Sequence, residues 1–96
     1  MKQVFLIMAH HTYIIYSETF DLYYKGETAD IEKRLADHNA DLSRFTAGKG
    51  PWKLVWAKTF PNRREALIEE KRLKKLNRRS LEKLIKEYVP VVSSKL

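Results

Sequence analysis

The 96-residue chain contains no cysteine, which excludes disulfides, cysteine-based zinc sites and thiol nucleophiles. Its three glycines match neither the dinucleotide-binding nor the P-loop spacing. The longest apolar run, residues 4–9, is far shorter than the ~20 residues of a membrane-spanning helix. The start of the chain also lacks the basic segment and cleavage site of a signal peptide. We therefore expect a cytoplasmic protein that does not associate with membranes.

Basic residues are concentrated in the second half of the chain. Residues 1–48 carry 5 basic and 7 acidic side chains, whereas residues 49–96 carry 14 basic and 5 acidic ones, a net charge of +9. Such a charge attracts polyanions, and nucleic acid is the natural candidate because counterion release supplies affinity. The alternative is a lysine-rich helix surface that only keeps the protein in solution. Charge by itself favours neither interpretation.

Hydrophobic periodicity and turn residues predict a single α+β domain, a small three-stranded antiparallel sheet flanked by helices in the order β-β-α-β-α-α. Trp52 and Trp56 are expected to share one strand face and to pack in the core. The predicted helix caps are Thr28 or Asp30, then Asn62, then Ser80. The expected strands cover residues 12–17, 22–27 and 52–60. The first expected helix follows the cap at Thr28 or Asp30 and ends near residue 39, and the other two cover residues 63–76 and 81–88.

We expect the domain to span residues 12–88, with residues 1–11 as an N-terminal extension and residues 89–96 as a C-terminal tail. The extension ends in His10-His11, which matches no metal-ligand spacing.

Two charged residues stand where the helical pattern calls for apolar side chains. Arg34 interrupts the stripe of the first helix, and Glu70 shares a face with Ala66 and Leu73 on the long helix. A charge facing a core costs roughly several kcal/mol unless it is paired or bound to a ligand. The two residues could form an ion pair with each other. Alternatively, Glu70 holds a divalent cation and Arg34 a phosphate.

Tyrosines and a histidine accompany these charges. Tyr13, Tyr16 and Tyr24 cluster in the predicted hairpin, with Tyr13 and Tyr24 as cross-strand neighbours. Aromatic packing is their commoner role, but a phenol can orient or deprotonate a water if a cation lowers its pKa from ~10. His38, one turn after Arg34, either shuttles a proton, holds a phosphate or is structural.

At these residues the sequence resembles the GIY-YIG nuclease superfamily, which is named for two strand motifs spaced as Tyr13 and Tyr24 are. The second motif survives as Tyr24-Lys25-Gly26, where strand alternation directs Lys25 away from the site. The first motif, His11-Thr12-Tyr13, keeps only its tyrosine. The resemblance covers residues 12–84, and it includes residues 28–39 as the first helix, Phe45-Thr46, residues 51–55 and residues 65–71, which are similar to small single-domain bacterial members.

The resemblance implies metal-dependent hydrolysis of DNA phosphodiester bonds in one step, catalysed with a single Mg²⁺ or Mn²⁺ ion. It also implies a role for each residue. Tyr24 would position or activate the attacking water with Tyr13 beside it, Arg34 would bind the scissile phosphate, and Glu70 would hold the metal. His38 would assist proton transfer or substrate contact, and Gly26 would let backbone and substrate approach closely.

The expected function is therefore a DNA endonuclease, with a role in DNA repair or recombination. One alternative is a nucleic-acid-binding module of the same fold that turns over little or nothing, and another is a structural domain whose basic surface serves solubility or binds an acidic protein. Because one small domain offers little to select a target, we expect a protein partner or DNA shape to supply specificity. The basic residues expected to track the DNA backbone are Arg63, Arg64, Lys71, Arg72, Lys74, Lys75, Arg78 and Arg79.

Overall fold

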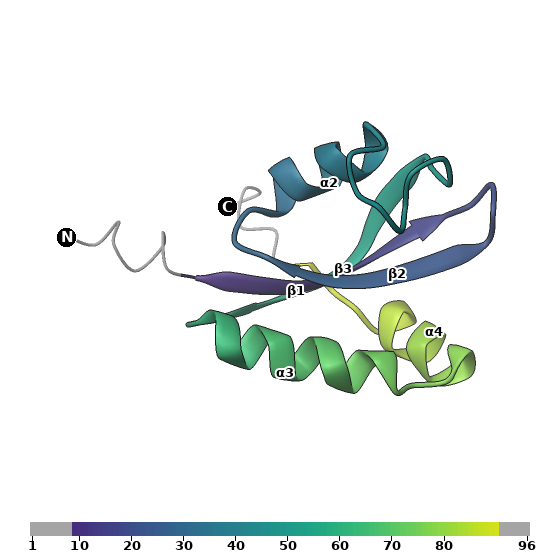
Figure 1. Ribbon diagram of the computed structural model, residues 1–96. Coiled ribbons are helices and arrows are strands. Elements are labelled where there is room, and N and C mark those ends of the chain that lie inside the picture. The colour runs from purple at the N-terminus through teal and green to yellow at the C-terminus, as the bar shows by residue number, and fades with distance from the viewer. Residues whose placement is uncertain (1–8, 91–96) are drawn as a thin grey trace, which may run out of the picture.

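The structure is a computed structural model that describes residues 9–90, and it confirms the predicted α+β fold and element order (Figure 1). Three antiparallel strands form one sheet in the order β2-β1-β3. The elements are β1 (His10–Ser17), β2 (Leu22–Thr28), α2 (Ile31–Asn39), β3 (Trp52–Phe60), α3 (Arg63–Lys74) and α4 (Arg78–Lys86). Within residues 9–90, no helix has the length and apolar character needed to cross a membrane.

The central strand begins two residues earlier than the sequence predicts. His10 pairs with Glu27 of β2, and the Nδ1 atom of His11 lies 2.9 Å from the Thr59 hydroxyl oxygen of β3. Both histidines belong to the sheet, since His10 is paired with Phe60 of β3 and His11 with Thr28 of β2 and Thr59 of β3. Residues 1–8 of the expected extension and residues 91–96 of the expected tail lie outside the described residues.

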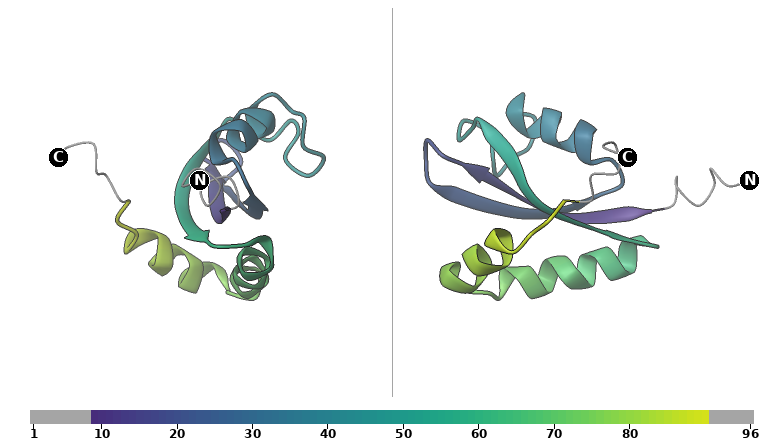
Figure 2. Two further views of the ribbon diagram at one scale, coloured as in Figure 1. Left: turned by 90° about the vertical axis from the view of Figure 1, so that its left-hand side faces the viewer. Right: turned by 180° about the vertical axis from the view of Figure 1, so that it is seen from behind.

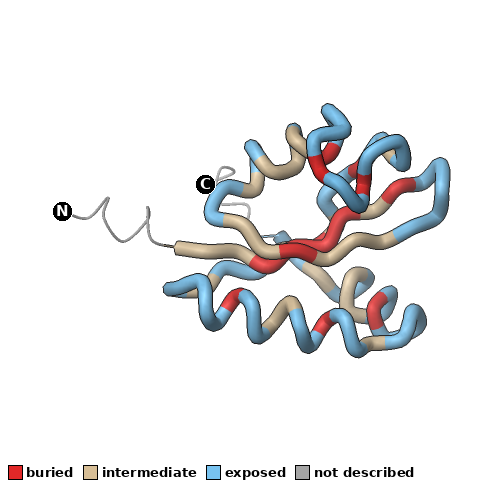
Figure 3. The backbone as a smooth tube through the Cα atoms, viewed as in Figure 1, coloured by how far each residue is buried: buried red, intermediate tan, exposed pale blue. Residues whose placement is uncertain are grey.

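The sheet separates two hydrophobic clusters. Helix α2 covers one face and helices α3 and α4 cover the other (Figures 1 and 2). Alternation along β1 sends Ile14 toward α3 and α4, and it sends Tyr13 and Ile15 toward α2. The burial pattern follows from this arrangement, since β1 lies buried in the middle while the outer faces of α2 and α3 remain exposed (Figure 3).

A bulge in β3 places the two tryptophans on opposite faces of the sheet. Ile14 pairs with Trp56, but the next residue of β1 pairs with Leu54, so Val55 is an extra residue on β3. The extra residue reverses the alternation, and Trp56 packs with Ile14 while Trp52 packs on the α2 side. The prediction that both tryptophans share one face was wrong, whereas their burial in the core is confirmed.

Side-chain caps fix where the helices begin. The side chain of Asp30 accepts from the backbone N–H of Lys33, so Asp30 and not Thr28 caps α2. Asn62 caps α3 as predicted. The expected cap at Ser80 was wrong, because Asn77 accepts from the backbone N–H of Ser80 at 2.8 Å and starts α4 three residues earlier. Helix α3 correspondingly ends at Lys74 rather than at residue 76.

Candidate active site

Two tyrosines and a histidine meet on the α2 face of the sheet. Tyr13 of β1 pairs with Gly26, so Tyr24 of β2 is its diagonal neighbour rather than its direct partner. The ring centres of the two tyrosines are 6.5 Å apart, and His38 of α2 lies 5.8 Å from Tyr13 and 5.2 Å from Tyr24. Tyr16 lies outside this group, because alternation places it against Tyr23.

Gly26 makes the position of the Tyr13 ring possible. A Cβ atom at residue 26 would lie 2.5 Å from the Tyr13 Oη atom and 2.6 Å from Cζ, closer than side chains pack. The resemblance implied that this glycine admits substrate, but here the space above it holds the tyrosine ring. The neighbouring Lys25 lies opposite Ile14 and therefore faces the other side of the sheet, as alternation predicts.

The Tyr13 phenol is buried and stays protonated near neutral pH. Burial raises the pKa of Tyr13 to about 12, and the neighbouring Arg34 guanidinium offsets only part of that effect. Its Oη atom lies 2.8 Å from Nε2 of His38. Near neutral pH, a phenol with so high a pKa acts mainly as a hydrogen-bonding group and not as a base.

His38 is fully buried between Tyr13 and the loop that follows α2. Its Nδ1 atom lies 2.6 Å from the hydroxyl oxygen of Thr46, which is also fully buried. Burial lowers the pKa of His38 to about 4, and the positive charge of Arg34 acts in the same direction. The imidazole is therefore neutral near pH 7, with one nitrogen as a donor and the other as an acceptor.

We expect this burial to make the protein less stable in mild acid. Unfolding returns the pKa of His38 from about 4 to about 6.5. Between these two pH values the unfolded chain therefore binds a proton that the native state does not bind. The free energy of unfolding should fall by up to about 1.4 kcal/mol per pH unit between pH 6.5 and 4. Urea denaturation of the wild type and of His38→Gln at several pH values isolates this residue's share. An equal slope in both proteins would contradict the expectation.

Arg34 and Glu70 do not form the structural ion pair that the sequence left open. One Nη atom of Arg34 donates to the Ser43 hydroxyl at 3.2 Å, and Glu70 pairs instead with Lys74, with an Nζ–Oε2 distance of 2.7 Å. Among the residues that the structure describes, no carboxylate pairs with Arg34. A half-buried guanidinium beside Tyr13 thus remains available to an anionic ligand.

Glu70 supplies a carboxylate close to the tyrosines. Its side chain is 15% exposed, its hydrogen bond to Lys74 raises the pKa of that lysine, and its charge adds a minor increase to the pKa of Tyr13. A groove of about 330 Å³ runs beside it along α3, lined there by Leu67, Glu70, Lys71 and Lys74. The Glu70–Lys74 pair therefore lies next to an open groove on α3, from which its charges act on the tyrosines.

The available donors fit a hard divalent cation. Across residues 9–90 there is no group of three or more His, Cys, Asp or Glu side chains that could hold a metal ion. Such a donor set does not suit zinc, which takes three or four protein ligands. One carboxylate is enough for Mg²⁺ or Mn²⁺ when water and substrate phosphate oxygens complete the coordination. Glu70 is the residue that would hold such an ion.

The predicted DNA-binding residues fall into two groups. Ion pairs with carboxylates join Arg63 to Glu27, Arg72 to Glu69, Lys74 to Glu70, and Arg78 to Asp21 and Glu82. The second group has no carboxylate partner in the part of the chain that the structure describes, and it consists of Arg64, Lys71, Lys75 and Arg79. This second group offers the more available positive charge on α3 and α4.

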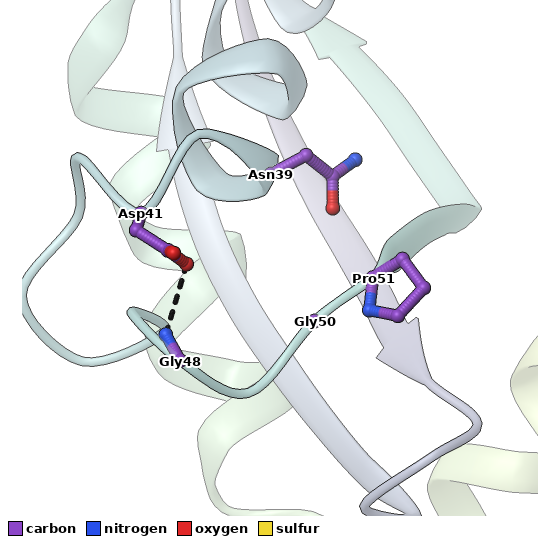
Figure 4. Close-up of a pocket in the computed structure, with 5 residues that line it drawn as sticks. All are labelled: Asn39, Asp41, Gly48, Gly50 and Pro51. Carbon is purple, nitrogen blue, oxygen red and sulfur yellow. Dashed lines mark hydrogen bonds between the residues drawn. The ribbon is translucent and has the colours of Figure 1, made fainter.

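Sequence reasoning missed the loop over residues 40–51 as part of the site. Its Ser43 and Thr46 side chains are buried and contact Arg34 and His38. Asn39 fastens the far end of the loop, because its amide bonds both the N–H and the carbonyl of Trp52. A bond from the Gly48 N–H to Asp41, at 2.9 Å, closes the loop on itself beside a surface pocket (Figure 4). The signals in the sequence were the pair of hydroxyl residues, three apart, in a turn-rich segment, and the Phe45-Thr46 match in the family resemblance, which gave Thr46 no role.

Comparison of the sequence with known protein families identifies the family of the chain. Residues 9–85 match the family model of the GIY-YIG catalytic domain, so the chain belongs to the GIY-YIG family. The predicted resemblance is confirmed. The domain is thus of nuclease type. It contains three strands, an arginine on the helix after the hairpin and a glutamate on the following long helix.

Within that family the chain is similar to UPF0213 proteins. One from Halobacterium salinarum is 40% identical over 77 residues, which cover 78% of this chain and 97% of the relative. Another, from Oceanobacillus iheyensis, is 38% identical over 77 residues and covers 79% and 88% of the two chains. The solution NMR structure of the UPF0213 protein BH0048 from Bacillus halodurans superimposes with a TM-score of 0.53 at 34% identity, over 82% of this chain and 84% of that one.

Proposed function

We propose that this protein is a divalent-metal-dependent endonuclease that hydrolyses DNA phosphodiester bonds. One observation carries the proposal: half-buried Arg34 has no carboxylate partner among residues 9–90, because Glu70 pairs with Lys74 on α3 and Arg34 bonds the Ser43 hydroxyl instead. A guanidinium and a carboxylate held apart beside two phenols suit a phosphate and its counter-ion. If Arg34 and Glu70 formed an ion pair with each other, neither side chain would be available to the phosphate or to its counter-ion.

Each side chain has a part in the proposed reaction. The fork of Arg34 binds the non-bridging oxygens of the scissile phosphate and stabilises the charge that builds up there. Glu70 holds the cation, which when bound neutralises the phosphate and the leaving oxygen. Tyr24, half-buried, positions or activates the attacking water, and protonated Tyr13 supports that water or the phosphate by a hydrogen bond. His38 keeps Tyr13 in place.

Lys74 has a second role in this proposal. Its ammonium neutralises Glu70 at 2.7 Å, so the half-buried carboxylate is not left alone without a cation. With a divalent ion held by Glu70, Lys74 would no longer be needed to neutralise the carboxylate, and its charge would add to that of Lys71, which lines the same groove on α3.

A panel of DNA substrates tests the proposal. Supercoiled, nicked and branched DNA are incubated with the protein and Mn²⁺ or Mg²⁺, with and without chelator, and the branched forms test the expected role in repair or recombination. We expect nicking that the chelator abolishes. Gel retardation that falls steeply with salt, without cutting in any metal, would instead indicate a nucleic-acid-binding module. No retardation at low salt would leave the structural domain. A cytoplasmic location and a protein partner that selects the target belong to the same proposal.

A further inference from the structure

A buried chain of hydrogen bonds runs from the active-site phenol to the loop after α2. Tyr13 Oη lies 2.8 Å from His38 Nε2, and His38 Nδ1 lies 2.6 Å from Thr46 Oγ1. His38 and Thr46 are fully buried, and Tyr13 is 2% exposed. Water has no access to the two imidazole nitrogens, so the direction of each hydrogen bond is decided by the three side chains alone.

Only two directions are open to this chain. A neutral imidazole donates from one nitrogen and accepts at the other. Either the Thr46 hydroxyl donates to Nδ1 and Nε2–H donates to Tyr13, or Nδ1–H donates to Thr46 and Nε2 accepts the proton of Tyr13. The first direction leaves the phenol proton free, whereas the second ties that proton to His38.

The surroundings of Thr46 decide between the two directions. Within residues 9–90, His38 Nδ1 is the one hydrogen-bond partner of the Thr46 hydroxyl, since Trp52 Nε1 bonds the backbone carbonyl of Thr46 and not its side chain. If the hydroxyl accepted from Nδ1–H, its own proton would be buried without an acceptor. Buried donors of that kind are rare in folded proteins. The first direction leaves the Tyr13 proton without an acceptor among residues 9–90, but Tyr13 is 2% exposed and lies beside half-buried Arg34, where a water or a phosphate oxygen can accept that proton, whereas Thr46 is fully buried.

We infer that Thr46 is a positioning residue that fixes His38 with its proton on Nε2, aimed at the Tyr13 oxygen. The Thr46 hydroxyl donates to Nδ1 and prevents the ring from turning over. Tyr13 then receives a hydrogen bond from His38 and keeps its own proton for a water or a phosphate oxygen. The catalytic consequence rests on the proposed function, while the placement of the proton does not.

Nitrogen-15 NMR of the imidazole reads the tautomer directly. In the wild type near pH 7 we expect the His38 resonances of a ring protonated on Nε2, with Nδ1 shifted as an acceptor of a hydrogen bond. Their absence in His38→Asn assigns them. A wild-type ring that carries its proton on Nδ1 overturns the inference, whether or not any variant folds.

Two variants of Thr46 test its role. Thr46→Val keeps the shape but loses the hydroxyl, so the Nδ1 resonance should move to that of a nitrogen without a hydrogen bond, and Thr46→Ser should restore it. The matched control is Thr12→Val, because Thr12 is equally buried but donates to the carbonyl of Ala66 at 2.6 Å. We expect that control to lose stability without moving the His38 resonances. An unmoved Nδ1 resonance in Thr46→Val would also overturn the inference.

Cleavage assays then separate this inference from the proposed function. In Thr46→Val we expect kcat to fall about 10- to 100-fold with little change in KM, and Thr46→Ser to stay close to the wild type. If the NMR signatures are as expected but the wild type cuts no DNA in any metal, the proposed function fails and the placement of the His38 proton stands. Full activity of a folded Thr46→Val would show that the loop hydroxyl has no part in the reaction.

Discussion

Glu70→Gln is expected to lower the rate of metal-dependent DNA cleavage by about 10³-fold. The amide has the shape of the carboxylate but no charge, so it does not hold a hard cation beside the scissile phosphate. The fold should be unchanged, since the side chain is already partly exposed and the substitution adds no volume. Initial rates of nicking on supercoiled DNA, taken over a series of Mn²⁺ concentrations, measure the effect.

The neighbouring glutamate provides a matched control for this substitution. Glu69→Gln removes the same charge from the same helix at a side chain that is 12% exposed, but Glu69 is held by Arg72 through hydrogen bonds of 2.9 and 2.8 Å and does not line the groove beside Glu70. We expect its cleavage rate to stay close to that of the wild type. DNA binding by Glu70→Gln should persist, because the loss of one negative charge frees Lys74. Wild-type cutting by Glu70→Gln at saturating metal would remove Glu70 from the proposed mechanism.

Local rules were enough to predict the fold. Strand alternation around Ile14, turn residues after each strand and the caps at Asp30 and Asn62 act over a few residues, and the structure preserves each of them. The predicted cap of the last helix was wrong because such local rules do not rank near-equal candidates, and Asn77 and Ser80 are almost equally good caps.

The bulge at Val55 could not be predicted, because an extra residue in β3 has no signature of its own in a segment without glycine or proline. The site was predicted as a set of residues but not as a network. Arg34 and Glu70 were recognised because a charge stood where an apolar side chain belonged. Their contacts to Ser43 and Lys74 depend on the path of a loop and on a rotamer, which no spacing encodes.

Gly26→Ala is expected to lower the free energy of unfolding by about 3–5 kcal/mol. The new methyl group would sit 2.5 Å from the Tyr13 oxygen and 2.6 Å from Cζ, so the ring must move. The ring packs against a buried cluster that includes Ile15 and Trp52, and its movement would break the buried hydrogen bond to His38. Urea denaturation at pH 7.5 gives the change in stability, and DNA cleavage should fall with it.

Two comparisons show whether the Tyr13 ring causes this loss. Gly48→Ala also adds a methyl group to a glycine, here in the loop after α2, but nothing lies within 4 Å of the new Cβ, so only the positive φ of +75° opposes it, at about 1–2 kcal/mol. In a Tyr13→Leu background the collision at residue 26 disappears, because leucine has no atom where the phenol end lies. There we expect Gly26→Ala to cost far less than in the wild type. An equal cost in both backgrounds would mean that the glycine is needed for the backbone of β2 itself, and that the close approach of Tyr13 follows from the sheet rather than depending on this residue.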